Sequence, residues 1–543
     1  MPSAGRAERG GGRGRCRAHP ACRLAALAPD GTECRPYHAT VNAPAETPRA
    51  RRGPVVFFCA LIGEFACLLW ALKAGDLSIP GHPARLVGAL LGAGVCFLAA
   101  VRFFPKGRAQ NQAVLFWFVA IALRVVLLPM EPGDDLWRYL WEGRIQREGF
   151  NPYRESPDST QLVTLREDGW WKINHPESAA IYPPATELTF AALARIVPAA
   201  AQSVASVILF KIVFILADLG TASLLLLLLR SEVVGNRRGA EGMEGSTEGK
   251  EDAVNSLCVP PTSLRATAVK PSSYRNAAWY AWNPAVAYAC AGAGHFDSLM
   301  LLTLTAAVLA LDRATAANET RPAWSWSLAS AAGLGLAIAF KLIPIFLLPV
   351  WLFALRRRAA ALLVSLAIPA ALTLPYGGPG VVLKPLLAFA DVTRFNDLVW
   401  GWIEAVTIPN PVGRNWPFTL ALALAVATIV WKFRADWRRS ALWVLGAVLL
   451  LSPTLHPWYV LWILPLAVWR GQTAWTILSL SVLTALLLWE TTTLWTAWQP
   501  NMLTRSMVVL PPLIAWLALR KQRSTSNFQR PTFNETAPSN RPR

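Results

Sequence analysis

Residues 204–229 read VASVILFKIVFILADLGTASLLLLLL, with Lys211 and Asp218 as the only charged side chains in the run. A membrane-spanning helix needs about 20 predominantly apolar residues, so this segment is long enough to cross a bilayer. In lipid, only a helix satisfies the backbone hydrogen bonds of an isolated segment. The run therefore predicts a transmembrane helix.

Apolar segments of this kind recur along the chain. They lie at 54–72, 85–104, 112–129, 185–200, 276–294, 296–312, 326–355, 357–375, 416–433, 440–455, 457–470, 472–490 and 502–520. Several are short for a full span, so we expect about 11–14 transmembrane helices. With 54% hydrophobic and 16% charged residues in 543, the composition excludes a soluble globular protein. The sequence predicts an all-α, polytopic membrane protein.

The formal charge of +19 is carried by the tails and by short loops between apolar segments. A membrane protein places Lys and Arg in this way on its cytoplasmic side, so the charge does not indicate a nucleic-acid partner. The rule puts loops 130–183, 376–415 and 491–501 on the outer side. Two topologies fit the middle of the chain equally. Either 185–200 spans the membrane and 326–355 is one broken helix, or 185–200 is re-entrant and 326–355 is a hairpin.

Three polar segments flank or interrupt the membrane domain, which we place at 54–520. Residues 1–53 form a basic tail that we expect to be disordered in the cytoplasm, 231–275 a solvated insertion loop, and 521–543 a second basic tail. The N-terminal tail contains Cys16, His19, Cys22, Cys34 and His38, but the spacing of these residues does not match that of a zinc site. We expect no metal site, no disulfide and no resident cofactor, although a divalent cation stays open.

The first outer loop contains the segment with the clearest chemistry, MEPGDDLWRYLWEGR at 130–144. Gly133-Asp134 predicts a helix start, with apolar and aromatic residues on one face. Asp135, Arg138 and Glu142 share the other face at helical spacing. A carboxylate there is placed to act as a general base toward an acceptor hydroxyl, and an arginine to bind a lipid-linked phosphate. The alternative is an interfacial Asp135–Arg138 ion pair that serves only topology.

Three more polar residues are candidates for binding that phosphate. Lys341 lies between apolar stretches, where an ionisable group usually has a function, although it could instead snorkel to the interface. His456, in His-Pro-Trp-Tyr, and His175, in Asn-His-Pro, could contact the phosphate or a hydroxyl. Each could equally shape a turn or bond to the backbone.

Several motifs resemble those of bacterial polyprenyl-phosphate-dependent mannosyltransferases, which are GT-C glycosyltransferases. They are DLWRYLWEGRIQ at 135–146, GFNPY at 149–153, INHP at 173–176, IYPP at 181–184, AWNP at 281–284, GHFD at 294–297, AFK at 339–341 and LHPWY at 455–459. The resemblance covers most of 110–520, without the tails or the 231–275 loop.

This resemblance implies an inverting transfer of a sugar, mannose in that family, from a polyprenyl-phosphate donor to a glycan or glycolipid acceptor. It places the active site on the outer face of a bacterial plasma membrane. It implies Asp135 as the catalytic residue, with Asp134 as the second choice. We expect sugar or acceptor contacts from the remaining polar and aromatic motif residues, which are Trp137, Tyr139, Tyr182, Trp458, Tyr459, His295 and Asp297. The alternative function is a transporter or flippase of lipid-linked saccharides.

Overall fold

The computed structural model describes residues 48–167, 169–197, 203–244, 271–316, 323–407, 414–492 and 501–528. Within these ranges the chain is helical, and its β-structure is limited to one bridge between Phe395 and Thr454. The predicted all-α fold class is confirmed. From Arg51 onward the described helices belong to one compact unit. The candidate zinc ligands of the basic tail lie outside the described residues, as do 245–270 of the insertion loop and 529–543 of the second tail.

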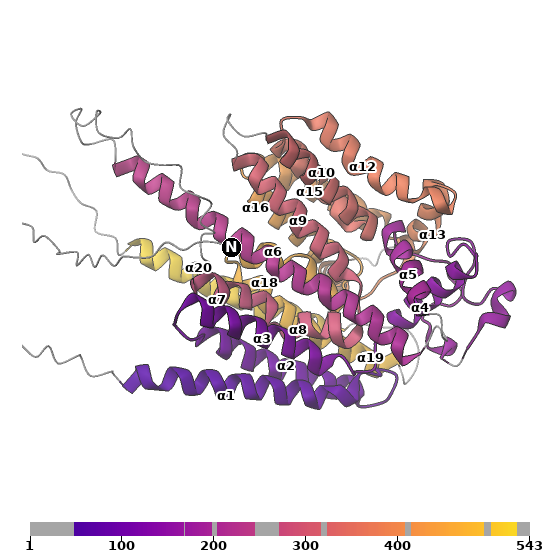
Figure 1. The fold of residues 1–543 in the computed structure, drawn as a ribbon, viewed down its shortest axis with the longest axis horizontal. Helices are drawn as coiled ribbons and strands as arrows, with labels where there is room; N and C mark the ends of the chain where they lie inside the picture. Colours follow the sequence, from indigo (N-terminus) through magenta and orange to yellow (C-terminus); the bar gives the residue numbers. More distant parts are fainter. Residues whose placement is uncertain are drawn as a thin grey trace, which may run out of the picture. The chain divides into compact units, whose positions relative to one another are not determined.

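The first half of the bundle contains α1 (Pro48–Ala71), α2 (His82–Arg102), α3 (Ala109–Leu127) and the longer α6 (Val204–Glu244). Figure 1 shows α1, α2 and α3 side by side, and Gly63 of α1 lies against Cys96 of α2. Helix α6 continues to Glu244, so the predicted insertion loop at 231–275 begins as a helical extension of α6. Two shorter helices, α4 (Asp134–Arg147) and α5 (Pro184–Ile196), come between α3 and α6 in the sequence. They pack on each other.

The second half of the bundle begins after the insertion loop. Its helices are α7 (Pro271–Ala281), α8 (Pro284–Ala287), a π-helix at Tyr288–Ala293, α9 (Asp297–Ala316), α10 (Ala323–Phe340), a 3-10 helix at Ile343–Leu347, α11 (Leu348–Ala354), α12 (Arg358–Leu372), α13 (Pro379–Val392), α14 (Leu398–Val406), α15 (Trp416–Lys432), α16 (Trp437–Leu451), a 3-10 helix at Pro457–Trp462, α17 (Leu464–Trp469), α18 (Thr473–Ser481), α19 (Leu488–Thr492) and α20 (Met502–Phe528).

Eight of the described helical segments are long and apolar enough to cross a membrane. They are Gly53–Ala74, His82–Arg102, Ala109–Leu127, Val204–Arg230, Asp297–Ala316, Arg358–Tyr376, Thr473–Glu490 and Met502–Arg520. Four shorter apolar segments accompany them, at Pro284–Ala293, Trp324–Phe340, Ile343–Ala354 and Trp416–Lys432. The chain is therefore a polytopic membrane protein.

Contacts of α10 decide between the two topologies that charge left open. The Trp351 indole of α11 donates a hydrogen bond of 2.8 Å to Ser330 Oγ, near the middle of α10. The Ser365 hydroxyl of α12 bonds to Ala331 O at 3.1 Å. The segment after Phe340 thus folds back along α10, so 326–355 is a hairpin with Lys341 at its turn.

Helix α5 completes this topology. It is only 13 residues long and packs on the C-terminal half of α4, where Gly143 lies against Phe190 and Gln146 bonds to Glu187. The following helix starts on the same side, because Lys211 of α6 donates a bond of 2.6 Å to Met130 O. The described part of segment 185–200, which ends at Val197, therefore does not traverse the bundle. Residues 295–297 consequently lie at the same end as α4.

Gly294 sets the direction in which the chain leaves the π-helix. Its φ of 79° lies in the left-handed region that favours glycine. An added Cβ would also approach the Leu136 side chain of α4 to 3.2 Å. The next residue, His295, donates its backbone N–H to Ala289 O at 2.8 Å. This turn brings the His295 side chain toward α4.

Candidate functional site

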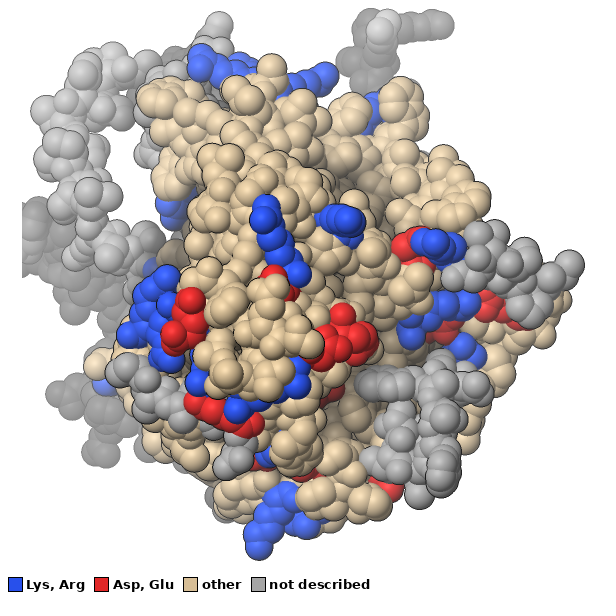
Figure 2. All heavy atoms as spheres, turned by 90° about the vertical axis from the view of Figure 1, so that its right-hand side faces the viewer, with Lys and Arg blue, Asp and Glu red and all other residues tan. Residues whose placement is uncertain are grey.

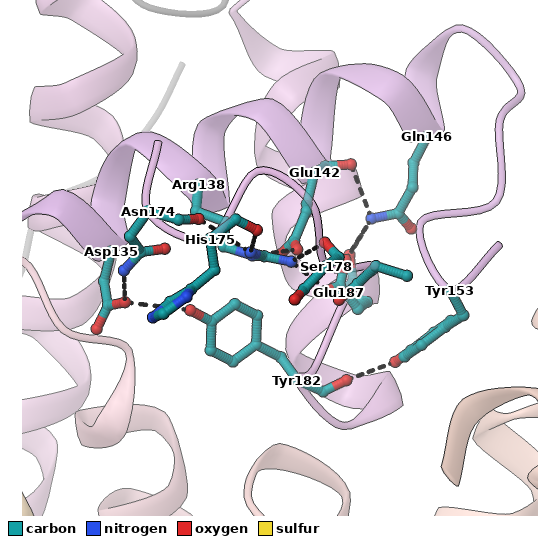
Figure 3. Close-up of polar contacts among 11 residues, drawn as sticks. Asp135, Arg138, Glu142, Gln146, Tyr153, Asn174, His175, Ser178, Tyr182 and Glu187 are labelled. Atoms are coloured by element: carbon teal, nitrogen blue, oxygen red, sulfur yellow. Dashed lines mark hydrogen bonds and ion pairs between the residues drawn. The ribbon is translucent and has the colours of Figure 1, made fainter. Parts of the chain in front are cut away.

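Asp135 lies in the first turn of α4 and is the centre of a polar cluster (Figure 3). Its Oδ1 accepts hydrogen bonds from Asn174 Nδ2 at 2.7 Å and from the Tyr182 hydroxyl at 3.3 Å. Its Oδ2 lies 3.5 Å from His295 Nδ1. Three parts of the chain, the start of α4, the loop at 174–182 and His295, thus meet at one carboxylate.

The two adjacent carboxyl groups differ in acidity. Burial raises the pKa of Asp134 to about 6, and the negative charge of Asp135 adds to this effect. Burial acts on Asp135 in the same direction, but His295 and the Asn174 amide outweigh it and hold the pKa of Asp135 below its ordinary value. Asp135 is therefore ionised at neutral pH, whereas Asp134 titrates just below neutrality.

Aromatic rings form one side of this cluster. His295 stacks on Trp458 with ring centroids 3.7 Å apart, His456 stacks on the same indole at 4.6 Å, and Phe395 stacks on His456 at 4.5 Å. Burial lowers the pKa of His456 to about 3, so its ring is neutral at physiological pH. Trp458 is only 7% exposed, and the two histidines cover it. The stack is thus a wall of the site.

Lys341 lies at the turn of the 326–355 hairpin and is paired with Asp297. Its Nζ donates to Asp297 Oδ1 at 2.7 Å, and the Trp462 indole donates to the same oxygen at 2.6 Å. The ammonium also lies 4.5 Å from the centre of the Tyr459 ring. Asp297 is 1% exposed, so Lys341 balances a buried charge.

Arg138 binds the outer loop. Its Nε donates to Glu142 Oε1 at 2.9 Å, and its two terminal nitrogens donate to the carbonyls of Asn174, His175, Ser178 and Ala179 at 2.8–3.1 Å. The residue is 1% exposed. Its guanidinium therefore holds the segment that carries Asn174 against Asp135.

The other residues predicted for the site lie at different depths. Tyr139 is buried and stacks on Phe190 at 4.6 Å. His175 is exposed, adopts a left-handed backbone with φ of 46°, and has Nδ1 3.4 Å from Glu177 Oε1. Trp137 packs under the Lys172 ammonium at 4.7 Å.

An open cleft of about 450 Å³ adjoins the cluster on the Asp134 side. It is lined by Asp76 and Ser78 after α1, by Glu131 and Asp134, and by Trp137, Trp171, Lys172 and Trp489. Trp171 is 71% exposed. Figure 2 faces the end of the molecule that carries α4 and α5, where acidic and basic side chains lie next to one another. The cleft offers carboxylates, an ammonium and an open indole face to a polar ligand.

The structure thus brings five predicted site residues together: Asp135, Tyr182, His295, Trp458 and His456. Beside them lie the Lys341–Asp297 ion pair and the Tyr459 ring that the Lys341 ammonium faces. Asn174 was not predicted as a site residue, although its place before His175 in a turn motif was a signal. Glu187, buried beside Arg138, was also not predicted, whereas Glu142, expected on the polar face of the helix, is buried beside Arg138 as well. Within the described residues, no three His, Cys, Asp or Glu side chains gather to hold a metal ion.

A protein-family comparison matches residues 177–392. The matched family is described as GPI transamidase subunit PIG-U. This segment is less than half of the 543-residue chain, and it contains Tyr182, His295, Asp297 and Lys341. No curated protein matches the chain.

The match corrects the function expected from the sequence motifs. The assignment to polyprenyl-phosphate-dependent mannosyltransferases is wrong, because the family that matches is a transamidase subunit and not a glycosyltransferase. The expected polyprenyl-phosphate sugar donor, the glycan acceptor, the flippase alternative and the bacterial plasma membrane are overturned with it. What supported them was the order of short motifs, which pack the outer loop against the helices and do not define a reaction.

Proposed function

We propose that this chain is a membrane subunit of a GPI-type transamidase complex and that it binds the lipid-linked glycan substrate. The observation that carries the proposal is the PIG-U match over 177–392, which includes four side chains of the Asp135 cluster and its neighbouring pair. The PIG-U family belongs to the eukaryotic endoplasmic reticulum membrane, so we place the chain there, with the other transamidase subunits as partners.

The chemistry of the site suits the polar end of a glycolipid. An ionised carboxylate, an amide and a phenol are typical groups for hydrogen-bonding to sugar hydroxyls. Asp135, Asn174 and Tyr182 supply these groups, and Trp171 supplies an exposed aromatic face at the mouth of the adjoining cleft. The apolar helices below would keep the acyl chains in the bilayer.

Glu142 and Arg138 give the outer loop a rigid base for this role. A binding site is effective when the side chains that contact the ligand are held by supporting hydrogen bonds. Here the Arg138 guanidinium donates hydrogen bonds to four backbone carbonyls within residues 174–179 of the loop (Figure 3). Binding by this site does not require a bond-making step, which would belong to another subunit.

Photo-crosslinking tests the proposal. The full chain in lipid nanodiscs is exposed to a photoreactive glycosylphosphatidylinositol, and the crosslinked fraction is compared with that for phosphatidylinositol without the glycan. We expect glycan-dependent crosslinking that falls about tenfold in Asp135→Asn, because one charge-assisted hydrogen-bond partner is lost. Asp158→Asn is the matched control, since Asp158 is an exposed carboxylate of the same loop.

Affinity purification of the tagged chain from its native membranes gives the second arm. We expect co-purification of a transamidase catalytic subunit in stoichiometric amounts. Equal crosslinking of the lipid that lacks the glycan, or recovery of the chain without any transamidase subunit, would contradict the proposal.

A further inference from the structure

A second polar cleft lies at the end of the helix bundle opposite Asp135. It has a volume of about 430 Å³ and is lined by residues of α7, of α17 and of the first turn of α18. Helix α18 runs from this cleft toward Trp489, which lines the cleft beside Asp134, so the two clefts lie at opposite ends of one helical segment.

Hydrogen-bond donors dominate the lining of this second cleft. The polar members are Ser272, Ser273, Asn276, Trp279, Trp469, Arg470, Gln472, Thr473 and Thr476. Among these lining residues there is one guanidinium and no carboxylate. Hydroxyls, amides, indole N–H groups and an arginine in this combination suit an oxyanion, and phosphate above all.

The N-terminus of α18 adds backbone donors to the cleft. This helix spans Thr473–Ser481, and the Gln472 side chain before it makes no capping hydrogen bond to it. The first N–H groups of a helix carry a partial positive charge and are a ready site for an anion.

A buried donor points to the same ligand. Among the residues that the structure describes, the Nε1–H of Trp469 finds no hydrogen-bond partner, although Trp469 is only 2% exposed and lines this cleft. A buried donor without an acceptor is unfavourable, and an anion in the cleft would supply the acceptor.

We propose that this cleft binds the phosphate of an anionic membrane phospholipid. The lipid is favoured over free phosphate because the cleft lies at membrane-helix ends: Val204–Arg230 ends and Thr473–Glu490 begins there. Leu229 and Val468 line it beside the polar groups, as expected for a site at headgroup level that also meets acyl chains. This site is separate from the proposed glycolipid site and does not depend on it.

Native mass spectrometry of the full chain tests the proposal. The chain is released from phosphatidylcholine nanodiscs that contain phosphatidic acid, with inorganic phosphate added in a parallel sample. We expect one phosphatidic acid to be retained, and retention to fall about tenfold in Trp469→Phe and in Arg470→Gln. Trp469→Phe removes the N–H donor and also shortens a buried aromatic side chain, so the melting temperature of each variant is measured alongside, and lipid loss in a variant that melts as the wild type does is assigned to the missing donor.

The matched control is Arg434→Gln, because Arg434 is an exposed arginine outside the cleft on the loop after α15. It should retain the lipid as the wild type does. Unchanged retention in both cleft variants would overturn the proposal. Displacement of the lipid by inorganic phosphate at about 1 mM, a weak-site concentration, would overturn the assignment to a phospholipid and indicate free phosphate instead.

Discussion

Replacing Arg138 by methionine should loosen the outer loop while leaving the helical bundle folded. The side chain is buried, and it bonds to Glu142 and to four loop carbonyls. Methionine fills a similar volume but donates no hydrogen bond. Glu142 would then be a buried carboxylate without its cation.

The expected cost follows from these contacts. Removing one partner of a buried ion pair destabilises by about 3–5 kcal/mol, mainly because the remaining charge stays buried. If the loop opens locally, that free energy corresponds to an increase of about 150- to 5000-fold in the opening equilibrium. The double variant Arg138→Met/Glu142→Gln leaves no lone charge, so it should recover part of the loss, about 1–3 kcal/mol.

Hydrogen exchange followed by mass spectrometry measures this opening in peptides that cover 174–182. The Ala180 amide is a useful reporter, since it donates to Pro152 O at 2.8 Å across the loop. Arg154→Met, which removes an exposed arginine of the same loop, should exchange as the wild type does. Exchange within about threefold of wild type in Arg138→Met would refute the reasoning, because that factor is below 1 kcal/mol.

Three further predictions concern other contacts of the site. Gly143→Ala should destabilise the protein by about 1–3 kcal/mol in thermal unfolding, because the added Cβ would lie 2.6 Å from Phe190 O across the α4–α5 contact; an unchanged melting temperature would contradict this packing. Lys341→Met should lower stability by about 3 kcal/mol because it leaves Asp297 buried without its cation, and Asp297→Asn in the same chain should restore part of it; a double variant as unstable as the single one would argue against the pair. The pKa of Asp134 is about 6 in the folded protein and 3.8 in the reference state, so the folded protein binds more protons than the unfolded chain between these two values. The contribution of protonated Asp134 to the free energy of unfolding is therefore present at about pH 4 and is lost as the pH rises to about 7. Unfolding of the wild type and of Asp134→Asn across this range should diverge by about 2 kcal/mol, and parallel pH curves would exclude the shift.

The fold class could be predicted because apolar runs in a membrane protein report directly on its helices. The run at 204–229 matches the apolar span Val204–Arg230 within α6, and that at 112–129 matches α3 within a few residues. The path between helices was harder to predict. Segments 185–200 and 326–355 would be apolar in either topology, so their composition cannot choose between the two. Only tertiary contacts such as Trp351–Ser330 show that the first is re-entrant and the second is a hairpin.

The site was partly predictable for a similar reason. Asp135, His295 and His456 stand out as ionisable groups in an apolar or aromatic setting, and the fold brings them together. Arg138 illustrates what sequence spacing cannot provide: it shares a helix with Asp135, but its partners are carbonyls about 40 residues away. Function was the weakest inference, since motifs that shape a loop were interpreted as motifs of a reaction.

The hairpin centred on Lys341 has a consequence for how this chain enters the bilayer. Its returning arm, Ile343–Ala354, is well short of the length that lipid insertion of a lone helix requires. The arm is therefore expected to enter the membrane together with α10, as one antiparallel unit, and not after it. Biogenesis of this region would then depend on the Trp351–Ser330 contact forming during insertion, so that a change at either residue would appear as misassembly and not as loss of binding.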